Sequence, residues 1–204
     1  MNEIEKSKEE IAITIRAYNQ KGWSPATSTN YSFRTIMDDE IIYVSRSGVD
    51  KSLFTAEDFI TVNRIGNPIG KDVEAVPSAE TLIHCILYDL FPETGVILHS
   101  HSVYPVLISH KFENNVDFEG YEIQKGFSGQ TTHDSKISIP IFDNTQDMDE
   151  FSTLLIENKQ RLLNHSFIMR KHGTYAWGKT LFEAKRHLET LEYLCQVEWM
   201  KKND

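Results

Sequence analysis

Two histidines stand one residue apart at the end of an apolar run, in the stretch V-I-L-H-S-H-S over residues 96–102. Side chains alternate between the two faces of a β-strand, so His99 and His101 would point the same way, about 7 Å apart along the chain. Two imidazoles at that separation can bind one metal ion through Zn–N bonds of about 2.0–2.1 Å. Many H-x-H pairs are simply polar residues at a strand end, and this alternative stays open for the pair alone.

A third histidine follows a second apolar segment, in I-M-R-K-H-G over residues 168–173. Gly173 permits a sharp turn or a close backbone approach, so His172 is a candidate third ligand. Three protein ligands and one open coordination position are typical of a catalytic zinc site rather than a structural one. Of the other histidines, only His133 is a functional candidate, and the rest are interpreted as structural: His84, His110, His165 and His187.

Three short stretches could bind an anion through backbone N–H groups. S-T-N-Y-S (28–32) precedes an expected strand, S-R-S-G (45–48) follows one, and P-S-A-E (77–80) begins an expected helix. The first turn of a helix has free N–H groups and the positive end of the dipole, and both attract phosphate. Ser, Gly and Asn are common in all turns, so an ordinary turn or helix start also explains each stretch.

Two glutamates are candidate acid–base groups beside such a site. Glu80 is expected in the first turn of a helix, where a carboxylate also stabilises the helix dipole without any catalytic role. Glu122, in G-Y-E-I-Q-K-G, is expected within a short strand between two glycines, where a plain surface position is the alternative.

The apolar periodicity predicts helices and strands in a mixed order. Helices are expected over 3–20, from Pro77 through Leu90, and over 103–112, 147–160 and 180–200. Strands are expected over 31–36, 40–45, 58–63, 95–101, 120–125, 136–142 and 166–171. Elements mixed in this way predict an α/β fold, in which helices cover the faces of a sheet.

Size and composition are those of an ordinary globular protein. The 204 residues are 40% hydrophobic and show no repeat or long linker, so we expect a single domain over residues 1–204. The net charge of −9 argues against a nucleic-acid partner. No apolar run approaches the roughly 20 residues of a membrane helix, and no signal peptide is visible, so a cytoplasmic location is expected. Cys85 and Cys195 are expected to be reduced core residues.

Taken together, these motifs resemble those of the class II aldolase family, which are zinc enzymes acting on sugar phosphates. The resemblance rests on H-S-H-S, the later H-G, P-S-A-E and the early S-x-N and S-x-S-G turns, and it extends from about residue 20 to 195. Three further stretches resemble the methylthioribulose-1-phosphate dehydratase branch of that family: G-Y-E-I-Q-K-G (120–126), P-I-F-D-N-T-Q-D (140–147) and H-G-T-Y-A-W-G (172–178).

This resemblance implies a single-domain α/β/α sandwich with a largely antiparallel central sheet, assembled as a homotetramer with sites at subunit boundaries. It implies one zinc ion per subunit, bound by His99, His101 and His172. In the dehydratases the catalytic acid–base group is the glutamate that aligns with Glu122, and in the aldolases it is the one that aligns with Glu80. This chain has both, so Glu122 is the expected acid–base group and Glu80 is the alternative. The implied substrate-binding residues are Asn30, Ser47, Gly48, Ser78, Ala79 and Glu80.

The implied reaction is the dehydration of 5-methylthioribulose 1-phosphate to 2,3-diketo-5-methylthiopentyl 1-phosphate, a step of methionine salvage. The nearest alternative keeps the zinc site and changes the reaction to aldol cleavage or C4 epimerisation of another sugar phosphate. A second alternative is a non-catalytic module such as the adducin head domains, against which the three retained histidines argue. The expected partner is a small sugar phosphate, with neither a nucleic acid nor a membrane involved.

Overall fold

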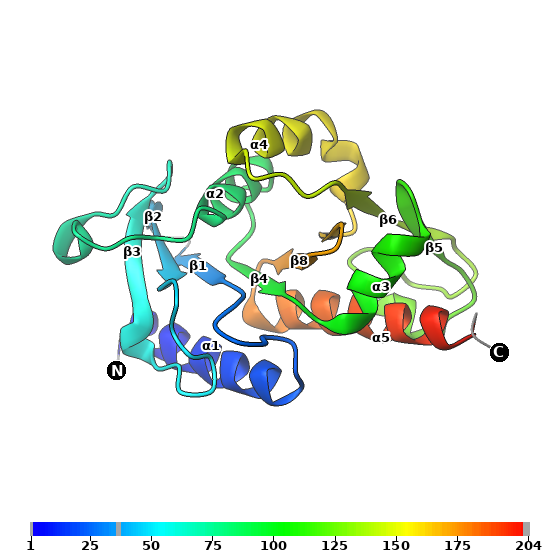
Figure 1. Ribbon diagram of the computed structural model, residues 1–204, viewed down its shortest axis with the longest axis horizontal. Coiled ribbons are helices and arrows are strands. Elements are labelled where there is room, and N and C mark those ends of the chain that lie inside the picture. Colours follow the sequence, from blue (N-terminus) through cyan, green and yellow to red (C-terminus); the bar gives the residue numbers. More distant parts are fainter. Residues whose placement is uncertain (1, 36–37, 202–204) are drawn as a thin grey trace.

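The computed structural model describes residues 2–35 and 38–201 of the chain (Figure 1). Its strands are β1 (Tyr31–Thr35), β2 (Asp38–Ser45), β3 (Phe59–Asn63), β4 (Val96–Ser100), β5 (Asn115–Phe118), β6 (Ile137–Phe142), β7 (Ser166–Met169) and β8 (Gly173–Gly178). They form one eight-stranded sheet in the order β3-β2-β1-β4-β8-β7-β6-β5. Neighbouring strands pair antiparallel except for β6 and β7, which are parallel.

Helices cover both faces of this sheet: α1 (Glu3–Gln20), α2 (Thr81–Leu90), α3 (Val103–Lys111), α4 (Met148–Glu157) and α5 (Leu181–Lys201). On one face, α1 and α5 bury Ile15 and Leu188 against Phe33 and Leu98 of the sheet. On the other face, α2 and α4 bury residues such as Ile83 and Phe151. Figure 1 shows these two helical layers on either side of the strands, and α3 packs against α5.

The predicted α/β/α sandwich with a largely antiparallel sheet is therefore confirmed. The helix over 3–20 begins where the Asn2 side chain accepts a hydrogen bond from the Glu5 N–H at 2.8 Å. It is followed by Gly22, whose φ of 76° lies in the left-handed region. Both cysteines are free and buried, as expected. The predicted strand over 31–36 ends in a residue that lies outside the described part of the chain.

Three element predictions are wrong. The strand expected over 120–125 is instead a 3₁₀ helix, η3 (Glu122–Gly126), because the buried Gln124 side chain accepts from the Tyr121 N–H at 3.2 Å and donates to the Ser135 carbonyl at 2.6 Å. The helix expected from Pro77 begins at Thr81, after a turn at Ser78–Glu80. The strand expected to reach residue 171 ends at Met169, because the chain turns there toward β8.

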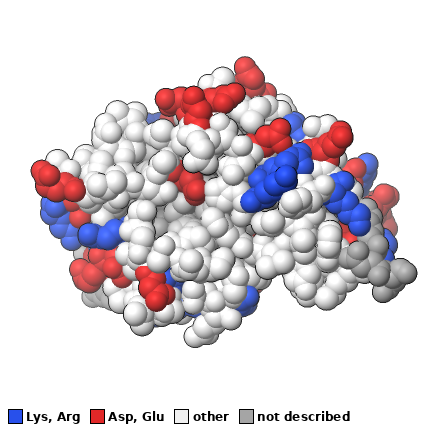
Figure 2. All heavy atoms as spheres, in the orientation of Figure 1, with Lys and Arg blue, Asp and Glu red and all other residues white. Residues whose placement is uncertain are grey.

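The surface carries charges of both signs. On the face that Figure 2 shows, Lys and Arg side chains are interspersed with Asp and Glu. Within the described ranges, none of the helices combines the length and the apolar character that crossing a membrane would require.

Candidate metal centre and substrate pocket

Two segments that are distant in sequence bring three imidazoles together. β4 pairs with β8 so that His99 lies opposite Tyr175, and the turn between β7 and β8 places His172 beside the end of β4. The ring centroids of His99 and His101 are 4.6 Å apart, those of His99 and His172 5.1 Å, and those of His101 and His172 4.5 Å. The three candidate ligands from the sequence therefore lie in one cluster.

Glu80 completes this cluster. Its Oε2 lies 3.4 Å from His99 Nε2, and its Oε1 lies 3.2 Å from His172 Nε2. One ligand atom from each of the four residues lies within 4.8 Å of the other three. Three imidazole nitrogens and one carboxylate oxygen are a donor set that zinc and related divalent ions bind, so these residues fit a metal ion.

The outer ring nitrogens of His99 and His172 have polar partners, as those of metal-binding histidines usually do. His99 Nδ1–H donates to the Thr174 carbonyl at 2.8 Å, and His172 Nδ1 lies 3.4 Å from Asn144 Oδ1. The Nε2 lone pair of His99 then faces His101 Nε2 at 2.7 Å. Two ring nitrogens so close together need a proton or a cation between them, and anchored Nδ1 atoms are typical of zinc ligands.

The pKa values of the cluster favour the metal-binding forms. Burial lowers the pKa of His99 well below its usual value, although the charge of Glu80 opposes this shift. Burial, aided by the charge of His172, lowers the pKa of His101 to about 4. Burial alone would raise the pKa of Glu80, but its hydrogen bonds with His172 and Asn30, together with the electrostatic effect of the neighbouring rings, hold it far below its usual value. The neutral forms of His99 and His101, beside the ionised carboxylate of Glu80, are the forms that bind a cation.

A buried chain of hydrogen bonds holds Glu80. Asn30 Nδ2 and the Tyr175 hydroxyl both donate to Glu80 Oε2, at 2.5 and 2.9 Å. Asn30 Oδ1 accepts from His84 Nε2–H at 2.5 Å, and His84 Nδ1 lies 2.7 Å from the Ser32 hydroxyl. The structural interpretation of His84 is therefore supported, since it orients Asn30. Tyr175 was not among the predicted site residues, although it lies in the H-G-T-Y motif.

The remaining predicted substrate-binding residues lie on turns near the strand ends. Ser47 and Gly48 are exposed after β2, and Ser78 and Ala79 form the turn before α2. The ammonium of Lys51 is buried between the first of these turns and the segment before β1: it donates to the Val49 carbonyl at 3.0 Å and to the Thr27 carbonyl at 3.5 Å. This lysine was not among the predicted site residues, because no distinctive local pattern surrounds it.

Glu122 is not brought to the cluster by any contact among the described residues. Its exposed carboxylate accepts from Lys125 Nζ at 2.7 Å and lies 3.4 Å from His133 Nδ1. The hydrogen bond from Lys125, aided by the charges of Lys125 and His133, lowers the pKa of Glu122, so the carboxylate is ionised at neutral pH. His133, the other functional candidate among the histidines, is thus the neighbour of Glu122.

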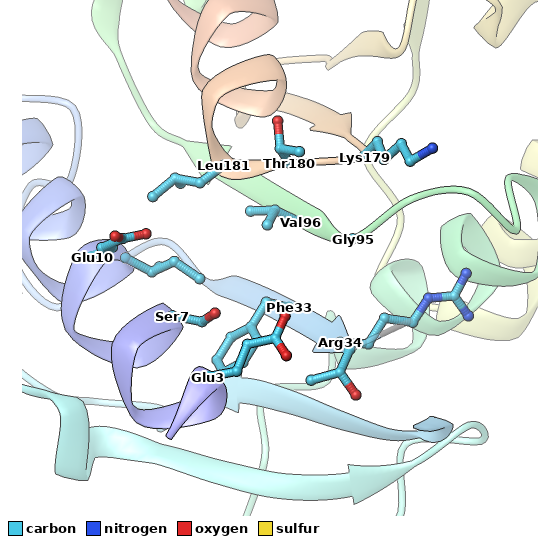
Figure 3. A pocket seen from close by; sticks show the side chains of 12 residues that line it. Glu3, Ser7, Glu10, Phe33, Arg34, Gly95, Val96, Lys179, Thr180 and Leu181 are labelled. Atoms are coloured by element: carbon cyan, nitrogen blue, oxygen red, sulfur yellow. The ribbon is translucent and has the colours of Figure 1, made fainter. Parts of the chain in front are cut away.

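A cavity of about 270 Å³ lies elsewhere, between α1, β1 and the first residues of α5 (Figure 3). Its walls include Glu3, Glu10 and Arg34. It reaches β4 at Val96, the end of that strand opposite to His99 and His101, and it contains none of the cluster residues. This cavity is therefore separate from the candidate metal centre.

Comparison with known proteins decides the family. The family model for the Class II Aldolase and Adducin N-terminal domain matches residues 9–199. The chain belongs to this family. It is 49% identical over 203 residues to the methylthioribulose-1-phosphate dehydratase of Picosynechococcus sp. (strain ATCC 27264 / PCC 7002 / PR-6), covering 98% of this chain and 95% of that protein. It is 42% identical to the protein of that name from Hahella chejuensis, covering 88% of this chain and 87% of that protein.

Solved structures of class II aldolase relatives share the fold at low sequence identity. The YgbL protein of Escherichia coli has a TM-score of 0.81 at 19% identity, covering 98% of this chain and 91% of that chain. An L-fuculose 1-phosphate aldolase has a TM-score of 0.79 at 18% identity, covering 97% of this chain and 87% of that chain. These likenesses concern the architecture of the sheet and its helices alone.

Proposed function

We propose that this protein is a metal-dependent lyase that removes water from 5-methylthioribulose 1-phosphate, giving 2,3-diketo-5-methylthiopentyl 1-phosphate. The observation that carries the proposal is the meeting of His99, His101 and His172 at one carboxylate, in a chain whose relatives at 49% and 42% identity are named as this dehydratase. The metal is zinc, one ion per subunit, because three imidazoles and a carboxylate or water are its usual ligands.

In this proposal the three histidines bind the metal ion, and Glu80 keeps their rings oriented. A bound zinc ion would supply Lewis-acid chemistry, which makes the C3–H beside the ketose carbonyl more acidic. Both oxygens of Glu80 already have partners, since Oε2 accepts from Asn30 and Tyr175 and Oε1 lies beside His172. Glu80 is thus a fixed anion that orients the imidazoles, and it is poorly placed to carry a proton through the reaction.

Proton transfer is the role of Glu122. Dehydration needs a base that takes the proton from C3 and an acid that gives a proton to the C4 hydroxyl as it leaves as water. An ionised, exposed carboxylate can take the first proton and return it in the second step. Because Glu122 makes no described contact with its own cluster, we place it at the metal centre of a neighbouring subunit.

The substrate phosphate binds at the turns beside the cluster, through Ser47, Gly48, Ser78 and Ala79. Thr29, just before Asn30, has a φ of 72°, so its backbone adopts the left-handed conformation that usually requires glycine. A turn in this conformation can direct backbone N–H groups toward an anion, even though Thr29 is not a glycine. Phosphate held there would place the C3 and C4 carbons within reach of the acid–base group.

The remaining features belong to the same proposal. The chain is a single domain over residues 1–204, it assembles as a homotetramer with shared sites, and it acts in the cytoplasm in methionine salvage. A sugar-phosphate aldolase or 4-epimerase of the same family is the competing function, because proteins that share this fold include an L-fuculose 1-phosphate aldolase and a protein described as a putative aldolase/epimerase/decarboxylase.

Product identification tests this function. Purified zinc-loaded protein incubated with 5-methylthioribulose 1-phosphate should yield a product that has lost one water, detected by mass spectrometry. Dihydroxyacetone phosphate as the product would instead establish aldol cleavage, and an isomer of unchanged mass would establish epimerisation.

Subunit mixing tests the placement of Glu122. Glu122→Gln and His101→Ala proteins should each be inactive, and refolding them together should restore part of the activity, since some hybrid sites combine one intact cluster with one intact Glu122. If the mixture stays inactive while the tetramers exchange subunits, Glu122 acts within its own chain or not at all.

A further inference from the structure

A second buried carboxylate lies directly behind the histidine cluster. Glu192 of α5 is only 4% exposed, and none of its oxygens is left without a donor. The Ser100 hydroxyl donates to Oε1 at 2.5 Å, the Thr174 hydroxyl donates to Oε1 at 3.0 Å, and the Ser102 hydroxyl donates to Oε2. Burying a carboxylate is costly, so its hydrogen bonds with three hydroxyl groups indicate a specific role.

The three hydroxyls belong to the segments that carry the candidate ligands. In H-S-H-S, His99 and His101 alternate with Ser100 and Ser102, so the imidazoles face the substrate side while the hydroxyls face α5. Thr174 follows the His172 turn, and its backbone carbonyl is the group that accepts the hydrogen bond from His99 Nδ1–H. Each hydrogen bond to Glu192 therefore involves either a neighbour of His99 or His101 in the chain or the residue whose carbonyl holds His99.

We propose that Glu192 is a positioning residue of the metal centre. Its carboxylate accepts hydrogen bonds from the end of β4, from the residue before α3 and from the start of β8, and it thereby orients the rings of His99 and His101. Ser102 is the first residue before α3, so the same bond also fixes where the chain leaves the sheet. Loss of the carboxylate would leave the imidazoles present but loosely oriented. Mutation of a group that hydrogen-bonds to a zinc ligand typically lowers metal affinity by about 10- to 100-fold.

A purely structural role, in which Glu192 only attaches α5 to the sheet, predicts something different. Glu198 provides the matched control: it is another buried carboxylate of α5, and it accepts from the Tyr121 hydroxyl at 2.6 Å. Its hydrogen bond does not involve β4 or β8. If attachment of α5 were all that mattered, Glu192→Leu and Glu198→Leu would lower stability without any selective effect on metal binding.

The test is zinc affinity of the full chain, measured by competition with a chromophoric chelator after metal removal, together with the visible spectrum of the cobalt-loaded protein. Glu192→Leu should lower zinc affinity by about 10-fold or more and change the cobalt spectrum, with Glu192→Gln in between, whereas Glu198→Leu should match the wild type. Urea unfolding confirms that each variant is folded. Wild-type affinity and an unchanged spectrum in folded Glu192→Leu would overturn the proposal.

If Glu192→Leu does not fold, Ser100→Ala and Ser102→Ala each remove one donor and keep the carboxylate. Unchanged zinc affinity in both would equally overturn the role of Glu192. The proposal rests on the proposed metal centre, but the two fail differently. A wild-type protein that binds no zinc removes the metal centre itself, whereas tight zinc binding by every variant removes only the role of Glu192.

Discussion

Gly173 lies directly against Ser100: a Cβ atom built on Gly173 would be 1.9 Å from the Ser100 carbonyl oxygen. No side chain can occupy that space, so only glycine lets the β7–β8 turn approach the end of β4. This contact is what carries His172 to the pair formed by His99 and His101. A single backbone approach therefore assembles the candidate metal centre from two distant segments.

Replacing Gly173 by alanine should separate these segments. We expect Gly173→Ala to lower stability by about 1–3 kcal/mol and to weaken zinc binding strongly, because His172 moves away with its turn. Gly178→Ala is the matched control, since its Cβ would be 2.6 Å from Glu183 Cβ at the far end of β8. Urea unfolding and bound zinc per chain distinguish the two, and equal zinc content in both variants would contradict this account.

Removing the Tyr175 hydroxyl should loosen Glu80 while leaving the ring in place, since the Tyr175 ring stacks on His99 with centroids 4.0 Å apart. A hydrogen bond to a charged group contributes about 1.5–3 kcal/mol, so kcat/KM of Tyr175→Phe should fall by at least about 10-fold. Tyr18→Phe, a change at a buried tyrosine of α1, should retain the wild-type value. Steady-state kinetics give the measurement. An unchanged kcat/KM in Tyr175→Phe would show that Glu80 does not depend on the hydrogen bond from the Tyr175 hydroxyl.

The Lys51 ammonium joins the turn after β2, which is proposed to bind phosphate, to the segment before β1. Lys51→Met removes the ammonium but keeps a side chain of similar length, so we expect KM to rise about 10-fold or more with a smaller change in kcat, and inhibition by inorganic phosphate to weaken in parallel. Lys71→Met, a change at an exposed lysine, controls for the loss of one positive charge. Phosphate inhibition that is equal in both variants would exclude Lys51 from the pocket.

Acid should destabilise the fold through a buried histidine away from the metal centre. Burial lowers the pKa of His187 to about 4; its Nδ1–H donates to the Trp177 carbonyl, and its Nε2 lies 2.9 Å from the Ser128 hydroxyl. Because the unfolded chain binds this proton near pH 6.5 and the folded chain only near pH 4, the stability present above pH 6.5 is lost as the pH falls between these values.

The loss from His187 is about 1.4 kcal/mol per pH unit within that range. Urea unfolding at pH 7 and pH 5 should therefore show a smaller decrease in His187→Gln than in the wild type. An identical decrease in the two proteins would mean that His187 does not contribute to acid sensitivity.

The sequence predicted what local patterns encode. Alternation along a strand predicted that His99 and His101 point the same way, and Gly173 signalled the close approach that brings His172 beside them. The mixed order of helices and strands predicted the layered α/β fold. In each case the deciding feature lies within a few neighbouring residues: the periodicity of apolar side chains, or a glycine that has no side chain.

Tertiary contacts decide the features that the sequence did not reveal. The segment around Glu122 alternates as a strand would, but the buried amide of Gln124 bonds within its own turn and to Ser135, and it winds the segment into η3. Tyr175 and Glu192 act on the site only because β8 and α5 lie beside β4. The hydrogen-bond partners of both residues are distant in sequence, so their roles could not be read from their neighbours along the chain.

In the proposed function, one metal ion held by His99, His101 and His172 enables the dehydration. The most direct test is to titrate zinc into the metal-free protein and measure bound zinc and diketone product in the same samples. Product formation should rise in proportion to bound zinc and saturate at one ion per chain. Full product formation without zinc, or equal formation by His172→Ala, would contradict the account.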